Sequence, residues 1–210
     1  SLWIFGGVIA LLGAISYAEL GARMPRSGGE YYFLSRIYHP LAGYLSGWVS
    51  LTVGFTASIA LSAMAMGAYL SGILGVDARW IALVVILAVS AIHSVHLRQS
   101  SRFQNLFTTL KLGMMVFLIL ACFWRPAELN ALNWDGNWFA ELSSAHYAVA
   151  LVFVVYAYSG WNAAAYITGE VLNPARNLPR ALIVGALLVS VLYILLQFGF
   201  LHQADRDALN

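Results

Sequence analysis

The sequence alternates between long uncharged stretches, rich in Leu, Val, Ile, Ala and Gly, and short clusters of charged residues. A helix needs about 20 mostly apolar residues to cross the hydrocarbon core of a bilayer. The alternation of about ten residues that is typical of membrane barrel strands is not present. The pattern therefore predicts an all-α integral membrane domain over residues 1–210, with six spanning helices at about residues 2–21, 40–72, 80–97, 101–124, 146–169 and 180–201.

The second stretch is longer than one straight crossing requires. No charged residue lies between Arg36 and Asp77. A stretch that exceeds the thickness of the hydrocarbon core tilts, or carries part of its length outside the core. We therefore predict a strongly tilted helix, preceded by a cytoplasmic lead-in helix before Pro40.

The charges on the predicted loops set the orientation, because Lys and Arg near the ends of spanning helices favour the cytoplasmic side. Loops 22–39, 98–102 and 170–180 hold Arg23, Arg26, Arg36, Arg98, Arg102, Arg176 and Arg180, whereas the opposite side holds Arg79, Arg125 and Arg206. We predict that the first three loops are cytoplasmic in a multi-pass protein of the plasma membrane or a bacterial inner membrane. Six crossings place both ends outside, and the chain opens at Ser1 without Met or a charged leader, so we expect a fragment that lacks at least one N-terminal span.

Composition narrows the class further. Hydrophobic residues make up 61% of the chain and charged residues 10%, against about a quarter charged in soluble domains. The net charge of +2 forms no basic surface, so nucleic acid is not an expected partner. The single cysteine, Cys122, forms no internal disulfide, and His93 with His96 lack a nearby acid or thiol, so we expect neither a metal site nor a cofactor.

Lys111 is the one charged residue deep inside a predicted span. It lies nine residues beyond Arg102, about 13 Å along the helix. Its four-carbon stem can return the ammonium to the cytoplasmic interface. Alternatively, the group faces a polar cavity and carries a proton or replaces a bound cation, as intramembrane ionisable residues often do. Both interpretations stay open at this point.

The fifth span is interrupted by the polar and small residues Tyr158, Ser159, Gly160, Trp161 and Asn162. Gly160 permits the backbone to leave helical geometry, and the polar neighbours can satisfy the freed amides and carbonyls. A helix that restarts here would favour a carboxylate at its N-terminus. Alternatively, the small residues Ser159, Gly160, Ala163 and Ala164 form a face that only allows a neighbouring helix to approach closely.

Two predicted cytoplasmic loops carry candidate gating residues. Glu170 and Arg176 border the turn after the fifth span, where they could pair, although exposed pairs contribute less than about 1 kcal/mol. In the first loop, Gly28 and Gly29 permit a sharp reversal, and Glu30 stands in the first turn of the helix that follows.

These segments resemble the amino acid, polyamine and organocation (APC) permease superfamily, and most closely its L-type amino acid transporters. The resemblance is ordered along nearly the whole chain and is carried by residues 13–21, 25–31, 103–105 with Lys111, 158–162 and 170–180. It implies a LeuT-like fold of two inverted five-helix repeats, with this chain supplying helices two to seven. The fifth span is then the broken sixth helix of the family.

The resemblance also implies roles for individual residues. Tyr156 corresponds to the aromatic gate over the substrate, and Tyr158, Ser159 and Gly160 to the unwound segment, with Trp161 and Asn162 in or beside the pocket. Lys111 corresponds to a lysine that occupies a sodium position in sodium-coupled relatives, which implies sodium-independent transport by proton coupling or exchange. Glu30, Glu170 and Arg176 form the expected cytoplasmic gate.

Two features bear on the substrate. Many relatives carry two acids after the broken helix, whereas this chain has Thr168, Gly169 and Glu170. No acid lies between Tyr156 and Tyr166, where some exchangers of cationic substrates place one, and this favours a neutral amino acid. The lipid bilayer surrounds the protein, and the sequence identifies no protein partner.

Other classes of membrane protein fit the sequence less well than a permease of amino acids. A polyamine or organic-cation permease would share the fold. An intramembrane serine protease would need a base close to Ser159, but the histidines lie near segment ends. A metal carrier would need further ligands beside His93 and His96, but no acid or thiol lies nearby. A purely structural membrane protein would need neither Lys111 at depth nor a break at Gly160.

Overall fold

A computed structural model describes residues 2–95, 97–124 and 144–203. These residues form helices and turns and contain no strand. The all-α prediction is therefore confirmed. The chain divides into two compact units, one of residues 1–33 and 113–210 and one of residues 34–112.

Five helical stretches of the described chain are long and apolar enough to cross a membrane. They are Leu2–Arg23, Pro40–Leu74, Ser101–Trp124, Ala145–Glu170 and Pro174–Gln203. The remaining predicted span, 80–97, corresponds to α5 (Ala78–Val95), an apolar helix that is shorter, and residue 96 lies outside the described residues. The multi-pass membrane character thus agrees with the hydropathy pattern.

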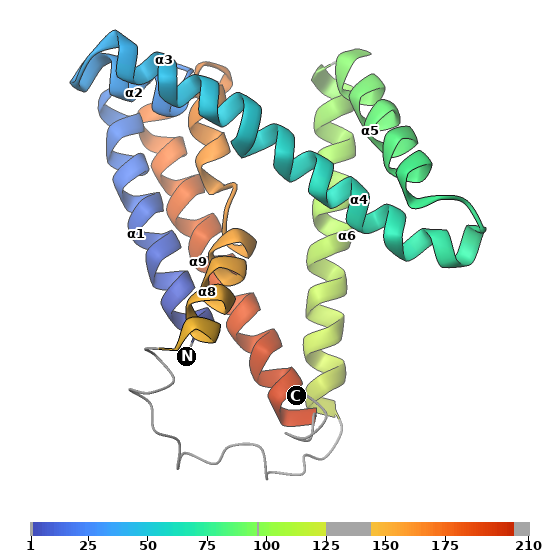
Figure 1. Ribbon diagram of the computed structural model, residues 1–210. Coiled ribbons are helices and arrows are strands. Elements are labelled where there is room, and N and C mark those ends of the chain that lie inside the picture. The colour runs from blue at the N-terminus through green and yellow to red at the C-terminus, as the bar shows by residue number, and fades with distance from the viewer. Residues whose placement is uncertain (1, 96, 125–143, 204–210) are drawn as a thin grey trace. The chain divides into compact units, whose positions relative to one another are not determined.

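The first unit is built around α1 (Leu2–Arg23) and α9 (Pro174–Gln203), which lie side by side (Figure 1). Small residues on one face of α1 allow this close approach. A side chain on Gly21, for example, would place its Cβ 2.4 Å from Leu178 Cδ2. The buried core between the helices consists of Ala14, Ala18, Leu178, Leu182 and Ala186.

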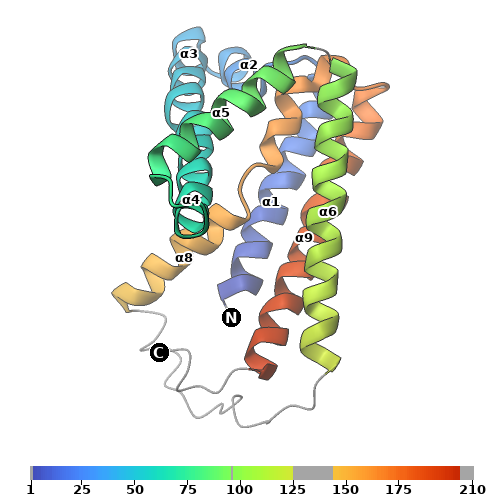
Figure 2. The same cartoon turned by 90° about the vertical axis from the view of Figure 1, so that its right-hand side faces the viewer.

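The same unit contains α8 (Ala145–Ala157), the 3₁₀ helix η3 (Trp161–Glu170) and the C-terminal part of α6 (Leu97–Trp124). The end of α6 contacts the end of α9, where Gln203 Nε2 donates to the Cys122 carbonyl at 2.5 Å. Figure 2, turned by 90°, again shows α1 beside α9. Helix α8 packs against α1, and η3 packs against both α1 and α9. These contacts position the interrupted segment between α8 and η3.

The second unit contains α3 (Pro40–Val49), the π-helix η1 (Ser50–Phe55), α4 (Thr56–Leu74) and α5, with α4 packed against α5. His39 caps α3, because its Nδ1 accepts a hydrogen bond from the Leu41 amide at 3.2 Å. The helix α2 (Gly29–Ile37) precedes Pro40. It is the predicted lead-in helix, while the tilt of the long segment stays a prediction.

One predicted loop, residues 98–102, is wrong. Helix α6 already begins at Leu97, and the side chains of residues 95–100, including Arg98, lie outside the described part. Charged residues at a helix end are compatible with helix, so charge alone misplaced this boundary.

The last helix also begins earlier than predicted, at Pro174 instead of residue 180. Proline is favoured at the first helical position because its missing N–H has no partner there. The Asn173 carbonyl accepts from the amides of Arg176 and Asn177, both at 3.0 Å, and so starts the helix. Much of the predicted loop 170–180 is therefore the start of α9.

Candidate functional site

The fifth span is broken where the sequence predicts it. Helix α8 ends at Ala157, and Gly160 has φ +97°, in the left-handed region that favours glycine. The chain then continues as η3, which contains a further non-helical residue, Ile167. In the part of the chain that the structure describes, no atom lies within 4 Å of a Cβ built on Gly160, so close packing against these residues is not the reason for this glycine.

Backbone groups freed by the break find partners nearby. The last helical bond of α8 runs from the Tyr158 amide to Val154 O at 3.1 Å, and beyond it the Ser159 amide donates to Tyr156 O at 3.0 Å. The Tyr193 hydroxyl, from α9, donates to Ala157 O at 3.3 Å. Such compensation is what a helix break needs inside a bilayer.

Tyr158 anchors the break against α1. Its side chain is 5% exposed, and its hydroxyl donates to Trp3 O at 3.0 Å. Its ring contacts Trp3 and Tyr193, with ring centroids 6.0 and 5.1 Å away. Three elements, α8, α1 and α9, thus hold the start of the interrupted segment.

Trp161 is held in place by α1. Its ring stands edge-on to Tyr17, with centroids 5.0 Å apart and an interplanar angle of 88°. A Cβ on Gly13 would lie 2.5 Å from Trp161 Cζ2, so the ring occupies space that only glycine leaves open. The close contact with this ring explains why position 13 is a glycine, which is not evident from the sequence.

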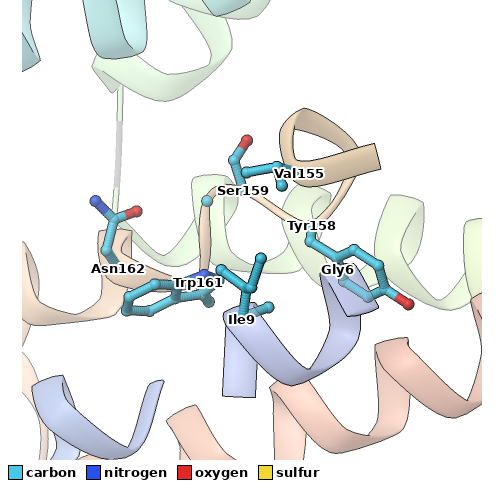
Figure 3. Close-up of a pocket in the computed structure, with 9 residues that line it drawn as sticks. Gly6, Ile9, Val155, Tyr158, Ser159, Trp161 and Asn162 are labelled. Atoms are coloured by element: carbon cyan, nitrogen blue, oxygen red, sulfur yellow. The ribbon is translucent and has the colours of Figure 1, made fainter. Parts of the chain in front are cut away.

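A cavity of about 220 Å³ adjoins the break within the first unit. Figure 3 places Trp161 and Ile9 between Asn162 on one side and Tyr158 on the other. The lining is uncharged and mostly apolar. It comprises Gly6, Ile9, Ala10, Val155, Tyr158, Ser159, Gly160, Trp161 and Asn162.

The cavity brings together five of the six predicted substrate residues, but not Tyr156. That side chain is 42% exposed and does not line this cavity, whereas its neighbour Val155 does. Lys111 is exposed and belongs to the second unit. The gating role of Tyr156 and the coupling role of Lys111 stay predictions.

Glu30 is the centre of a polar cluster in the first unit. Its Oε1 accepts hydrogen bonds from the Tyr17 hydroxyl at 2.8 Å and from Asn162 Nδ2 at 2.6 Å. Its Oε2 accepts a hydrogen bond from the Tyr166 hydroxyl. In addition, the Gly169 amide donates to Ser27 Oγ at 2.7 Å. The segment η3 is therefore joined both to α2, through Glu30, and to the connection that precedes α2, through Ser27.

This environment favours the charged form of Glu30. Burial raises the pKa of the carboxyl, but hydrogen bonds from Tyr166, Asn162 and the Glu30 backbone amide outweigh burial and hold the pKa below its usual value. The half-buried group is therefore an anion at neutral pH.

The other predicted gate residues do not meet. Glu170, at the end of η3, and Arg176, on α9, are both exposed and form no ion pair with each other. Over the described ranges, the one ion pair joins Glu19 and Arg23, at 2.7 Å within α1. An exposed ion pair contributes little stability, because its attraction is weak in water and the two long side chains lose conformational freedom when they are held together.

Sequence reasoning missed Tyr17 and Tyr166, which complete the Glu30 cluster. A tyrosine in an apolar stretch is weak evidence for a polar site, because its aromatic ring also packs well among apolar side chains. The stronger signal is the spacing of Asn162 and Tyr166, two polar groups four residues apart in one apolar span.

Residues 1–208 match the amino acid permease family. The chain belongs to this family. The family consists of transport proteins and not enzymes, so the protease alternative has no support. The resemblance inferred from residues 13–21, 25–31, 103–105, 158–162 and 170–180 is confirmed.

Individual permeases are similar to the chain over nearly its full length. The human b(0,+)-type amino acid transporter 1 is 36% identical over 207 residues, which cover 95% of this chain and 42% of that protein. The mouse Asc-type amino acid transporter 1 is 30% identical over 91% of this chain and 38% of its own length. The serine/threonine exchanger SteT of Bacillus subtilis is 28% identical, over 95% of this chain and 45% of its own length. The chain thus spans less than half the length of these relatives.

Proposed function

We propose that the protein is a sodium-independent amino acid permease that moves its substrate across the cell membrane by alternating access. The cavity at the Gly160 break is the observation that carries this proposal. Relatives named as amino acid transporters and as a serine/threonine exchanger support it. Transport proceeds by exchange of amino acids or by coupling to protons.

The substrate is a neutral amino acid bound at the break. Among the residues that the structure describes, no charged side chain lines the cavity, so a cationic or anionic side chain of a substrate would be left without a partner. The start of η3 and the polar residues Ser159 and Asn162 offer hydrogen bonds to the carboxylate and ammonium groups. Tyr156 closes over the bound substrate.

Residues outside the cavity supply coupling and gating. Lys111 couples transport to protons or replaces a sodium ion. Glu30, Glu170 and Arg176 act in a cytoplasmic gate, in which Glu30 joins η3 to the first loop. Residues 22–39, 98–102 and 170–180 lie on the cytoplasmic side of the membrane, and the whole protein has the LeuT-like arrangement of inverted repeats.

The test is uptake by the full-length protein in proteoliposomes. The vesicles are loaded with unlabelled amino acids, and labelled neutral, cationic and anionic amino acids are supplied in sodium-free buffer, with and without a pH gradient. We expect sodium-free uptake of neutral amino acids. Dependence on internal substrate identifies exchange, and dependence on the gradient identifies proton coupling.

The control is the same protein in vesicles with polyamines or organic cations outside. Uptake of these compounds without uptake of any amino acid would overturn the proposal. It would replace the neutral substrate with a cationic one of the same superfamily.

A further inference from the structure

Asn162 touches two sites at once. It lines the cavity at the break, and its Nδ2 donates to Glu30 Oε1 at 2.6 Å. Figure 3 shows the two ends of this amide pointing in opposite directions, with the oxygen turned toward the other labelled cavity residues and the nitrogen turned away. One side chain therefore links the cavity to the first turn of α2, where Glu30 lies.

Glu30 determines which end of the amide faces the cavity. An ionised carboxylate only accepts hydrogen bonds, whereas an amide has a donating and an accepting end. The NH₂ group of Asn162 must therefore face Glu30, and its carbonyl oxygen must face the other way. A turn of the amide by half a revolution would place two acceptors 2.6 Å apart.

Glu30 is itself held from other elements. Tyr17 on α1 donates to the same Oε1 at 2.8 Å, and Tyr166 on η3 donates to Oε2. The carboxylate is fixed by donors on both oxygens and cannot easily turn away from Asn162. A hydrogen bond to a charged acceptor also polarises the amide, which makes its carbonyl oxygen a better acceptor.

We propose that Glu30 is a positioning residue that acts through Asn162, so that Asn162 Oδ1 accepts a hydrogen bond from the ammonium group of a substrate in the cavity. The inference rests on the proposed function and deepens it. None of the described residues that line the cavity carries a carboxylate, and Glu30 supplies negative charge to the cavity through the side chain of Asn162. An ammonium group is a donor without lone pairs and can bind only to an acceptor.

The test compares Glu30→Gln with Glu19→Gln in full-length transporter, with uptake of a labelled neutral amino acid as the readout. The Glu30→Gln variant keeps the shape and one acceptor but loses the charge and lets the Asn162 amide turn either way. Glu19 is an exposed carboxylate on α1 and provides the matched control. We expect Glu30→Gln to raise KM about five- to tenfold with little change in the maximal rate, and Glu19→Gln to leave both unchanged.

A purely structural role of Glu30 predicts a different result. Combining Glu30→Gln with Asn162→Ala separates the two cases, because a residue that acts through Asn162 has no further effect once Asn162 is gone. We expect the double variant to match Asn162→Ala alone. An unchanged KM in Glu30→Gln, or a full additional loss in the double variant, would overturn the inference.

Two further measurements keep the test decisive. If a variant transports too slowly, the shift in Tm caused by the amino acid gives the same comparison from binding. If Glu30→Gln does not fold, Tyr166→Phe removes one donor from Glu30 and is expected to raise KM about two- to threefold. Absence of amino acid uptake by the unmodified protein contradicts the proposed function, whereas normal uptake with unaffected variants contradicts only the role of Glu30.

Discussion

At the residue scale, the break depends on one backbone conformation. Gly160 has φ +97°, and a Cβ at this position would meet nothing within 4 Å. An alanine would therefore cost only backbone strain, about 1–2 kcal/mol. The same substitution at Gly185, a helical glycine of α9 with equally open surroundings, should instead stabilise by about 0.5–1 kcal/mol.

We predict that Gly160→Ala lowers the stability of the purified protein in detergent and reduces uptake, while Gly185→Ala raises stability and preserves uptake. Denaturant unfolding and initial uptake rates measure the two effects. Equal effects of both substitutions would mean that the left-handed conformation of Gly160 contributes nothing particular to the fold.

The Glu30 cluster has a defined pH dependence. Its folded-state pKa lies below the ordinary value of 4.5, so the stabilisation from the carboxylate is complete above that value and is lost as pH falls through the lower folded-state pKa. The groups that face the carboxylate are the hydroxyls of Tyr17 and Tyr166 and the amide of Asn162, which all donate hydrogen bonds to it.

We therefore predict that Glu30 does not carry the coupled proton. Uptake between about pH 5.5 and about pH 8, which lies above the ordinary carboxyl range, should have the same pH profile in Glu30→Gln as in the unmodified protein, at a higher KM. A profile that loses its pH dependence in this variant would assign the coupled proton to Glu30.

At the scale of elements, η3 is fastened to the first loop along its length. Asn162 and Tyr166 reach Glu30 near its start and middle, and the Gly169 amide donates to Ser27 Oγ near its end. The segment is not one regular helix, because Ile167 inside it is non-helical, and 3₁₀ turns have poor hydrogen-bond geometry. The tertiary contacts therefore help to hold η3 in place.

We predict that Ser27→Ala makes the end of η3 open more often. Loss of one hydrogen bond of about 1 kcal/mol should speed hydrogen exchange at the Gly169 amide about fivefold. Ser71→Ala, which removes a hydroxyl bonded to Ala68 O at 2.9 Å on α4, serves as the control and should leave that amide unchanged. Unchanged exchange at Gly169 in Ser27→Ala would mean that the Ser27 contact does not restrain η3.

At the scale of the whole molecule, the spans were predictable because the bilayer imposes them on the sequence. Charge-free length located α1, α4, α6, α8 and α9, and Gly160 among polar neighbours located the break. Helix starts were less predictable, since the charge cluster at 98–102 and the prolines before residue 180 suit a helix end as well as a loop.

The contacts of the site were beyond the sequence for a different reason. Asn162 and Glu30 are separated by 132 positions, and neither residue by itself indicates the other. Their pairing depends on the packing of α1 with α9 and η3, which brings the first loop to the broken helix. Hydropathy predicts which segments are buried in a membrane, but it does not predict which faces of them meet.

Lys111 and the cavity belong to different compact units. The cavity residues all lie in the first unit, whereas Lys111 lies in the second. If Lys111 acts in coupling and does not contact the substrate, its substitution should leave substrate binding intact and impair transport. In Lys111→Met, the amino acid should still raise Tm, but uptake should fall at least about tenfold or lose its response to a pH gradient. Arg102→Met, at another exposed cation of α6, should retain both properties. Full uptake by Lys111→Met with an unchanged pH response would exclude Lys111 from the coupling mechanism. It would instead favour the interpretation that its ammonium group reaches the membrane interface.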